Sequence, residues 1–290
     1  MSGVYSGVRL ASAKVADNNE IPVVVSKRGV VAASDLVSGL TGDLMALLSV
    51  TDLGMLSEAA AAAADSVFHE VADVDFVAPY RRPRKIWGIG LNYREHAGDL
   101  SENVPTEPAS FMKGDHTIIG PGDPIPVPSQ SNRTTAEAEL GLVIGRECYQ
   151  VEEDEALEYV AGVCPVLDQT AEDILERNPR FLTRSKNFPG FFSFGPTIVG
   201  LDAVLAHWGS LDAVEVSTVI NGEVHRKNVV ANMTFDPAFL VSFHSKVMPL
   251  FPGDIISPGT PGAVRIKPGD VVECRIPGVG VLANPVVAGR

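Results

Sequence analysis

The sequence is poor in cysteine, in basic residues and in long apolar runs. Its three cysteines, Cys148, Cys164 and Cys274, are an odd number and too widely spaced for a zinc motif, which argues against a disulfide framework. Basic residues number 23 against 36 acidic ones, a formal net charge of −13, so nucleic acid is not an expected partner. No apolar run reaches the roughly 18 residues that a bilayer span requires, and the N-terminus lacks the layout of a secretory signal. We therefore expect a cytoplasmic protein with no membrane segment.

The length of 290 residues allows one large domain or two unequal ones. Residues 1–80 mix short apolar runs with two predicted helices, one at 34–50 with leucines every three or four residues and an alanine-rich one at 56–64. A stretch rich in proline and basic residues at 77–85 has the composition of an extended connector. We predict a small α+β domain over residues 1–80 and a larger domain over residues 81–290.

Short strand-like runs dominate the larger domain. We expect strands at 86–91, 140–144, 214–220 and 271–276, and one helix at about 152–163. Asn221-Gly222 favours a hairpin turn because both central residues need positive φ. Pro-Gly-Asp at 252–254 and at 268–270 indicates turns into two further strands. The predicted fold class is mixed and mainly β, with a rolled or barrel-like sheet.

Three acidic side chains form a candidate metal site. Glu137 and Glu139 open an apolar run, and residues two apart in a strand point to the same face. Two carboxylates on one face repel each other unless a cation lies between them, an arrangement that suits Mg²⁺, Mn²⁺ or Ca²⁺. Asp168 follows a buried segment and is the candidate third oxygen ligand. The alternatives are a solvated surface strand for the glutamates and a helix N-cap for Asp168.

Several short motifs, in one order, resemble the fumarylacetoacetate hydrolase family. Residues 90–97, GLNYREHA, are similar to its G-x-N-Y-x-x-H signature, and residues 137–146, EAELGLVIGR, to its E-x-E-L-x-x-V-I-G segment. The similarity continues through DQTAED at 168–173 and GTP at 259–261 and covers roughly residues 84–287. Each fragment is weak alone, but many fragments in the right order make the resemblance strong.

The resemblance implies a fold, a cofactor and a set of roles. The fold would be a β-roll or barrel-like catalytic domain that forms a homodimer. Its cofactor would be Mg²⁺ or a similar ion, with a small 2-oxo or diketo acid as the partner that completes the coordination. The residues would be Glu137, Glu139 and Asp168 as metal ligands, His96 as general base, Lys113 as a cationic catalytic partner, and Lys186 and Thr260 on the substrate side.

Two positions depart from the family pattern. Asp99, three residues after His96, can orient the imidazole ring, but the family usually has the longer Glu there, and a misplacement near 1 Å weakens such a dyad. Glu172 stands where Arg is common, which should weaken attraction for a second substrate carboxylate or favour a cationic or hydroxylated substrate. Arg265 is the candidate for a replacement positive charge.

Three classes of function follow from these residues. The expected function is a metal-dependent hydrolase that cleaves a carbon–carbon bond in a small 1,3-diketo, acylpyruvate-like acid. The alternative is a decarboxylase, isomerase or tautomerase of an oxaloacetate-like 2-oxo acid, which uses the same metal-stabilised enolate without a well-placed water. A non-catalytic scaffold that binds a small acid is the third class, and the mutually repelling carboxylates argue against it.

Overall fold

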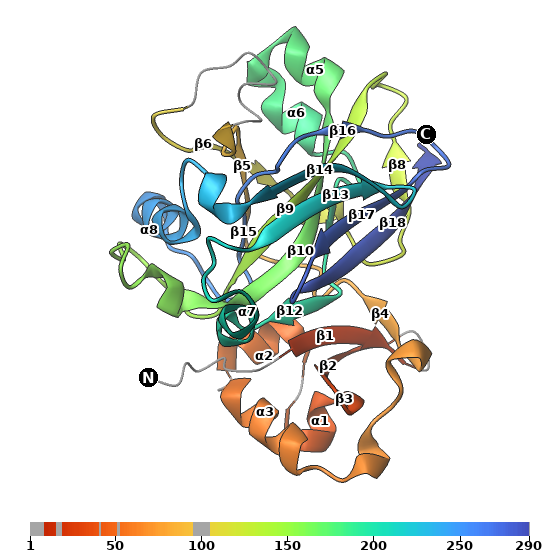
Figure 1. Ribbon diagram of the computed structural model, residues 1–290, viewed down its shortest axis with the longest axis vertical. Coiled ribbons are helices and arrows are strands. Elements are labelled where there is room, and N and C mark those ends of the chain that lie inside the picture. Colours follow the sequence, from red (N-terminus) through yellow and green to blue (C-terminus); the bar gives the residue numbers. More distant parts are fainter. Residues whose placement is uncertain (1–8, 16–18, 41, 51–52, 95–104, 290) are drawn as a thin grey trace.

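A computed structural model describes residues 9–15, 19–40, 42–50, 53–94 and 105–289 of the chain. Its strands form two sheets, and the N-terminal segment lies at one end of a larger body (Figure 1). This is the mixed, mainly β fold that the sequence predicts. Among the described residues, no helix combines the length and the apolar character needed to cross a bilayer.

The N-terminal segment combines short strands with short helices. Its described elements are β1 (Arg9–Lys14), β2 (Glu20–Ser26), β3 (Gly29–Ala32), α1 (Ala33–Leu36), α2 (Leu44–Val50), α3 (Leu53–Ala62), η2 (Asp65–Val67), η3 (Val71–Asp73) and β4 (Asp75–Val77). The alanine-rich helix is confirmed by α3. The single helix predicted at 34–50 is wrong, because Gly39 and Gly42 adopt φ of 85° and 98° between α1 and α2, a conformation that interrupts a right-handed helix.

The larger sheet joins this segment to the rest of the chain. Its other strands are β5 (Ile86–Gly90), β6 (Ala109–Lys113), β7 (Ile118–Ile119), β9 (Thr134–Ile144), β10 (Val160–Ala171), β11 (Phe192–Phe194), β12 (Thr197–Val199), β15 (Ile255–Ser257) and β16 (Val264–Arg265). Because β1 pairs with β12, hydrogen bonding continues across the proposed domain boundary, and the division at residue 80 stays a prediction.

Two long strands run through the centre of this sheet. β9 and β10 pair in antiparallel register, and every residue of both is buried. The helix predicted at 152–163 is wrong: a 3₁₀ turn, η5 (Ala156–Tyr159), leads directly into β10. A strand buried on both faces is a continuous apolar run, which sequence periodicity does not separate from a buried helix.

The smaller sheet packs against one face of this central pair. It contains β8 (Ile125–Val127), β13 (Glu215–Ile220), β14 (Glu223–Val229), β17 (Val271–Ile276) and β18 (Gly280–Ala288). Alternate residues of β9 share its core, in the set Ala138, Leu140, Leu142, Val216, Val272 and Leu282. The β13–β14 hairpin is confirmed, with Asn221 at φ 51° and Gly222 at φ 85°. The intervening residues of β9 therefore point away from the smaller sheet.

The remaining elements lie around the two sheets. They are η4 (Asp115–Thr117), α5 (Glu172–Arg177), η6 (Pro179–Phe181), α6 (Leu182–Lys186), α7 (Leu201–Trp208), η7 (Val230–Asn232) and α8 (Pro237–Val247). The two predicted Pro-Gly-Asp turns are confirmed, since Gly253 and Gly269 have positive φ immediately before β15 and β17. Cys148, Cys164 and Cys274 are all buried and form no disulfide.

Candidate metal centre

The three predicted carboxylates converge on one face of the central strand pair. Asp168 of β10 stands directly opposite Glu137 of β9, and Glu139 lies two residues further along the same strand. One ligand atom from each of the three lies within 4.8 Å of the others. Their residues are 8%, 2% and 1% exposed for Glu137, Glu139 and Asp168. The surface-strand alternative is therefore wrong.

The N-cap alternative for Asp168 is also wrong. The helix that follows it, α5, begins after Ala171, and that position makes no side-chain capping hydrogen bond. The Asp168 side chain instead contacts lysines: Lys186 Nζ lies 2.6 Å from Oδ2 and Lys113 Nζ lies 2.5 Å from Oδ1. Asp168 thus faces the acidic cluster and not the helix end.

Neighbouring donors fix the two glutamates. Thr135 and Thr170 donate hydroxyl hydrogen bonds of 3.1 and 2.5 Å to Oε1 of Glu137. Ser257 Oγ and the Gly259 N–H donate bonds of 2.6 and 2.8 Å to Oε2 of Glu139. Glu139, held through Oε2, keeps its Oε1 oxygen with which to bind a cation, whereas the Oε2 oxygen of Glu137 is shared with Lys186.

The buried ammonium groups of Lys186 and Lys113 partly offset the negative charge of the three carboxylates. Lys186 Nζ bridges Asp168 Oδ2 and Glu137 Oε2, the latter at 3.0 Å. Burial alone would lower the pKa of Lys186, but Asp168 and Glu137 outweigh it and raise that pKa overall. Lys113 donates to the backbone oxygens of Lys186 and Phe191, each at 2.7 Å, and burial lowers its pKa to about 8 despite the nearby Asp168.

The donor set fits a hard divalent cation. Three carboxylates against two ammonium groups leave one excess negative charge in a buried place. Burial, together with Asp168, raises the pKa of Glu139 to about 8, so its ionised form is disfavoured without further positive charge. Carboxylate oxygens are the ligands of Mg²⁺, Mn²⁺ and Ca²⁺. The three residues can therefore hold one such ion.

A cavity of about 500 Å³ opens beside the cluster. Glu137, Lys186 and Thr260 line it, so the two residues predicted on the substrate side both border the space a ligand would occupy. Lys113 is not among the lining residues, and its side chain is 1% exposed. In this structure its ammonium group orients Asp168, and a contact between Lys113 and substrate stays a prediction.

The two departures from the family pattern have different outcomes. His96 and Asp99 lie outside the described residues, so the proposed base and its partner stay predictions. Glu172 does line the cavity, where its carboxylate pairs with Arg133 at 3.0 Å. Arg265 does not supply a replacement charge there, because its exposed guanidinium donates to the backbone oxygen of Asn132.

Sequence reasoning missed several residues of the site. Thr135 and Thr170 each lie two positions from a predicted ligand, so strand alternation could have placed them on the same face. Ser257 and Arg133 gave no such signal, because their contacts depend on pairing between distant parts of the chain.

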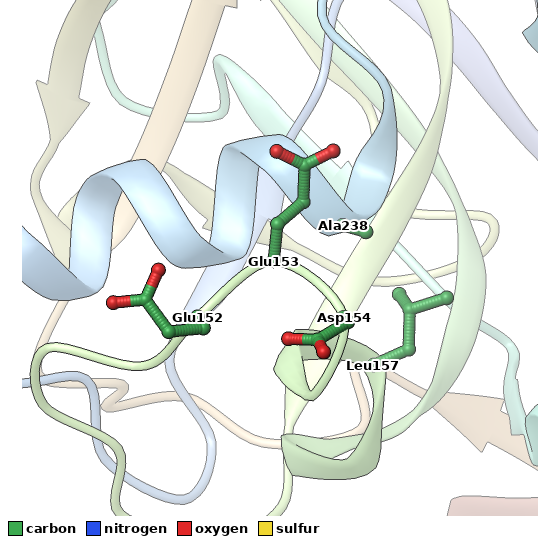
Figure 2. Close-up of a pocket in the computed structure, with 5 residues that line it drawn as sticks. All are labelled: Glu152, Glu153, Asp154, Leu157 and Ala238. Atoms are coloured by element: carbon green, nitrogen blue, oxygen red, sulfur yellow. The ribbon is translucent and has the colours of Figure 1, made fainter.

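A second acidic hollow lies elsewhere on the protein, and its carboxylates do not converge. It is lined by Glu152, Glu153, Asp154, Leu157 and Ala238, beside α8 (Figure 2). Figure 2 shows the Glu153 carboxylate pointing away from the other two. Lys246 pairs with exposed Glu152 at 2.9 Å. Among the described residues only Glu137, Glu139 and Asp168 form a group compact enough for a metal ion.

Comparison with known proteins agrees with this geometry. The family profile described as "Fumarylacetoacetate (FAA) hydrolase C-terminal" matches residues 85–287. The mitochondrial oxaloacetate tautomerase of Xenopus laevis is 32% identical over 241 residues, which cover 79% of this chain and 74% of that protein.

Solved structures of two enzymes share the whole fold. The 5-carboxymethyl-2-hydroxymuconate delta-isomerase from Mycobacterium smegmatis is 29% identical with a TM-score of 0.76, over 97% of this chain and 99% of that one. Maleylpyruvate hydrolase from Sphingobium sp. SYK-6, solved with manganese(II) and pyruvate, is 26% identical with a TM-score of 0.80, over 97% and 100%. The chain therefore belongs to the fumarylacetoacetate hydrolase family.

Proposed function

We propose that this protein is a divalent-metal-dependent tautomerase or isomerase of a small 2-oxo acid. The observation that carries the proposal is the group of three buried carboxylates within 4.8 Å of one another, beside a cavity of about 500 Å³. The named relatives add support, because tautomerases and an isomerase are among the most similar proteins. Carbon–carbon bond hydrolysis, as in the related maleylpyruvate hydrolase, becomes the second candidate.

Each residue of the site would have its own role in this reaction. Glu137, Glu139 and Asp168 would hold the ion, and Mg²⁺ or Mn²⁺ bound there would polarise the 2-oxo group of the substrate. Lys186 is a cavity-lining cation, and it would stabilise negative charge that develops on that oxygen. The Thr260 hydroxyl would border the bound acid, and a homodimer stays a prediction.

Tautomerisation needs only proton movement. A base removes a proton from carbon 3, the C–H electron pair becomes the C2–C3 double bond, and the 2-oxo oxygen gains a proton. Imidazole has an ordinary pKa near 6.5, so we assign the base to His96. Hydrolysis would need in addition an attacking water, and the short Asp99 side chain is less suited to hold one.

Hydrogen exchange at carbon 3 separates the two candidates. With Mn²⁺ present in D₂O, we expect the protein to speed exchange in oxaloacetate or acetylpyruvate, followed by proton NMR, without releasing cleavage products. His96→Ala should slow exchange by about 10²- to 10⁴-fold. The control is His225→Ala, a change at an exposed histidine of β14. This variant should catalyse carbon-3 exchange at the wild-type rate.

Three outcomes would count against the proposal in different ways. Stoichiometric cleavage products would favour the hydrolase. Exchange that is equally fast in His96→Ala would refute the assigned base. Exchange no faster than with Mn²⁺ alone, for every 2-oxo acid tried, would refute the function.

A further inference from the structure

We propose that Glu172, held by Arg133 beside Glu176, is a specificity-determining residue that selects 2-oxo acids with an uncharged tail and rejects a second carboxylate. This inference rests on the proposed function and concerns the part of the cavity away from the metal ligands. The named oxaloacetate tautomerases act on a dicarboxylate, so the inference predicts a different substrate range for this chain.

One continuous stretch of chain forms the wall that carries these residues. After β10 ends at Ala171, the chain turns through α5, η6 and α6, which lie together at the end of the central strands (Figure 1). From this stretch Glu172, Leu175, Glu176, Pro179 and Leu182 line the cavity. Three of these five side chains are apolar, so the wall offers contact to hydrocarbon.

The charge on this wall is negative. Arg133 Nε lies 3.0 Å from Glu172 Oε2, and the same guanidinium contacts Glu176 Oε1 closely. One positive group shared between two carboxylates leaves an excess negative charge. The Glu172 side chain is 18% exposed, and burial raises its pKa, so this carboxylate is already poorly solvated. A substrate carboxylate brought beside it would be repelled.

Among the described residues that line the cavity, no lysine or arginine besides Lys186 is present to offset this charge. Lys186 is the cation among the lining residues, and it is bound to Glu137 and Asp168. An uncharged acyl tail, in contrast, would meet Leu175, Pro179 and Leu182 without losing solvation of a charge.

Acetylpyruvate and oxaloacetate are a matched pair for the test, because they differ mainly in a terminal methyl group against a carboxylate oxygen. We expect the wild-type kcat/KM for carbon-3 exchange to be about tenfold or more higher for acetylpyruvate. Glu172→Gln keeps the shape and removes the charge, so the preference should shrink about tenfold, through a gain with oxaloacetate. Glu155→Gln, at an exposed loop position outside the cavity, should leave the ratio unchanged.

A second variant probes the apolar part of the wall. Leu182→Ala should lower kcat/KM for butanoylpyruvate by about tenfold and leave oxaloacetate nearly unaffected. A wild-type preference for oxaloacetate, or a preference that Glu172→Gln does not change, would overturn the inference and leave the proposed function standing. If neither acid is turned over, the proposed function itself fails.

Discussion

Glu139→Gln is expected to lower affinity for Mn²⁺ by at least about 100-fold and kcat/KM by a similar factor or more. Glutamine preserves the shape of the side chain and can still accept the bonds from Ser257 and the Gly259 N–H. It lacks the negative charge that a divalent cation requires of its ligands. Calorimetric titration with Mn²⁺ measures the first quantity, and carbon-3 exchange measures the second.

Ser257→Ala is a milder substitution to compare with Glu139→Gln. It removes the hydroxyl that fixes Glu139 without touching a proposed ligand, so the loss of metal affinity should be smaller, about 10- to 100-fold. Glu58→Gln, at an exposed position of α3, serves as the unaffected control. Wild-type Mn²⁺ affinity in Glu139→Gln would show that Glu139 is not a ligand.

Asp254→Ala should lower the free energy of unfolding by about 3–5 kcal/mol. Asp254 is fully buried and accepts a bond from Lys85 Nζ at 2.7 Å and bonds from the backbone N–H groups of Lys85 and Phe251, both at 2.8 Å. Its removal leaves the buried Lys85 ammonium group without its ion-pair partner. Urea unfolding monitored by circular dichroism gives the difference.

An exposed ion pair provides the comparison for Asp254. Lys246 and Glu152 lie 2.9 Å apart, close to the separation of the buried pair, but both side chains are largely exposed. Because water screens such pairs, Glu152→Ala should cost less than about 1 kcal/mol. Equal effects of the two substitutions would contradict the role assigned to burial.

Local sequence was sufficient for part of the site. The two-residue spacing of Glu137 and Glu139 predicts a shared face in any strand, and the structure has them on one face of β9. The position of Asp168 opposite Glu137 depends on strand register between segments far apart in sequence, which spacing does not give. Local sequence offered Asp168 as a ligand or as a helix N-cap, and the family resemblance favoured the ligand.

The wrong helix prediction and the contacts that the sequence did not predict have physical causes. Residues 160–163 were assigned to a helix because a strand buried on both faces loses its period of two. The sequence did not predict the contacts of Lys113 and Lys186 with Asp168, because these contacts arise only when β6 and α6 fold against β10. The pairing of Glu172 with Arg133 likewise depends on the end of β10 lying next to the start of β9.

Two kinds of structure form the candidate site: central strands carry the proposed metal-binding carboxylates, and short helical turns carry the side chains of the cavity wall. The carboxylates that would bind a metal ion sit on central strands, hydrogen-bonded along their whole length and fully buried. The tail-facing side chains belong to one short run of helical turns between β10 and β11. Substitutions in that run can alter which acids are accepted while the reactive end stays intact, so ligand preference can diverge among relatives faster than chemistry does.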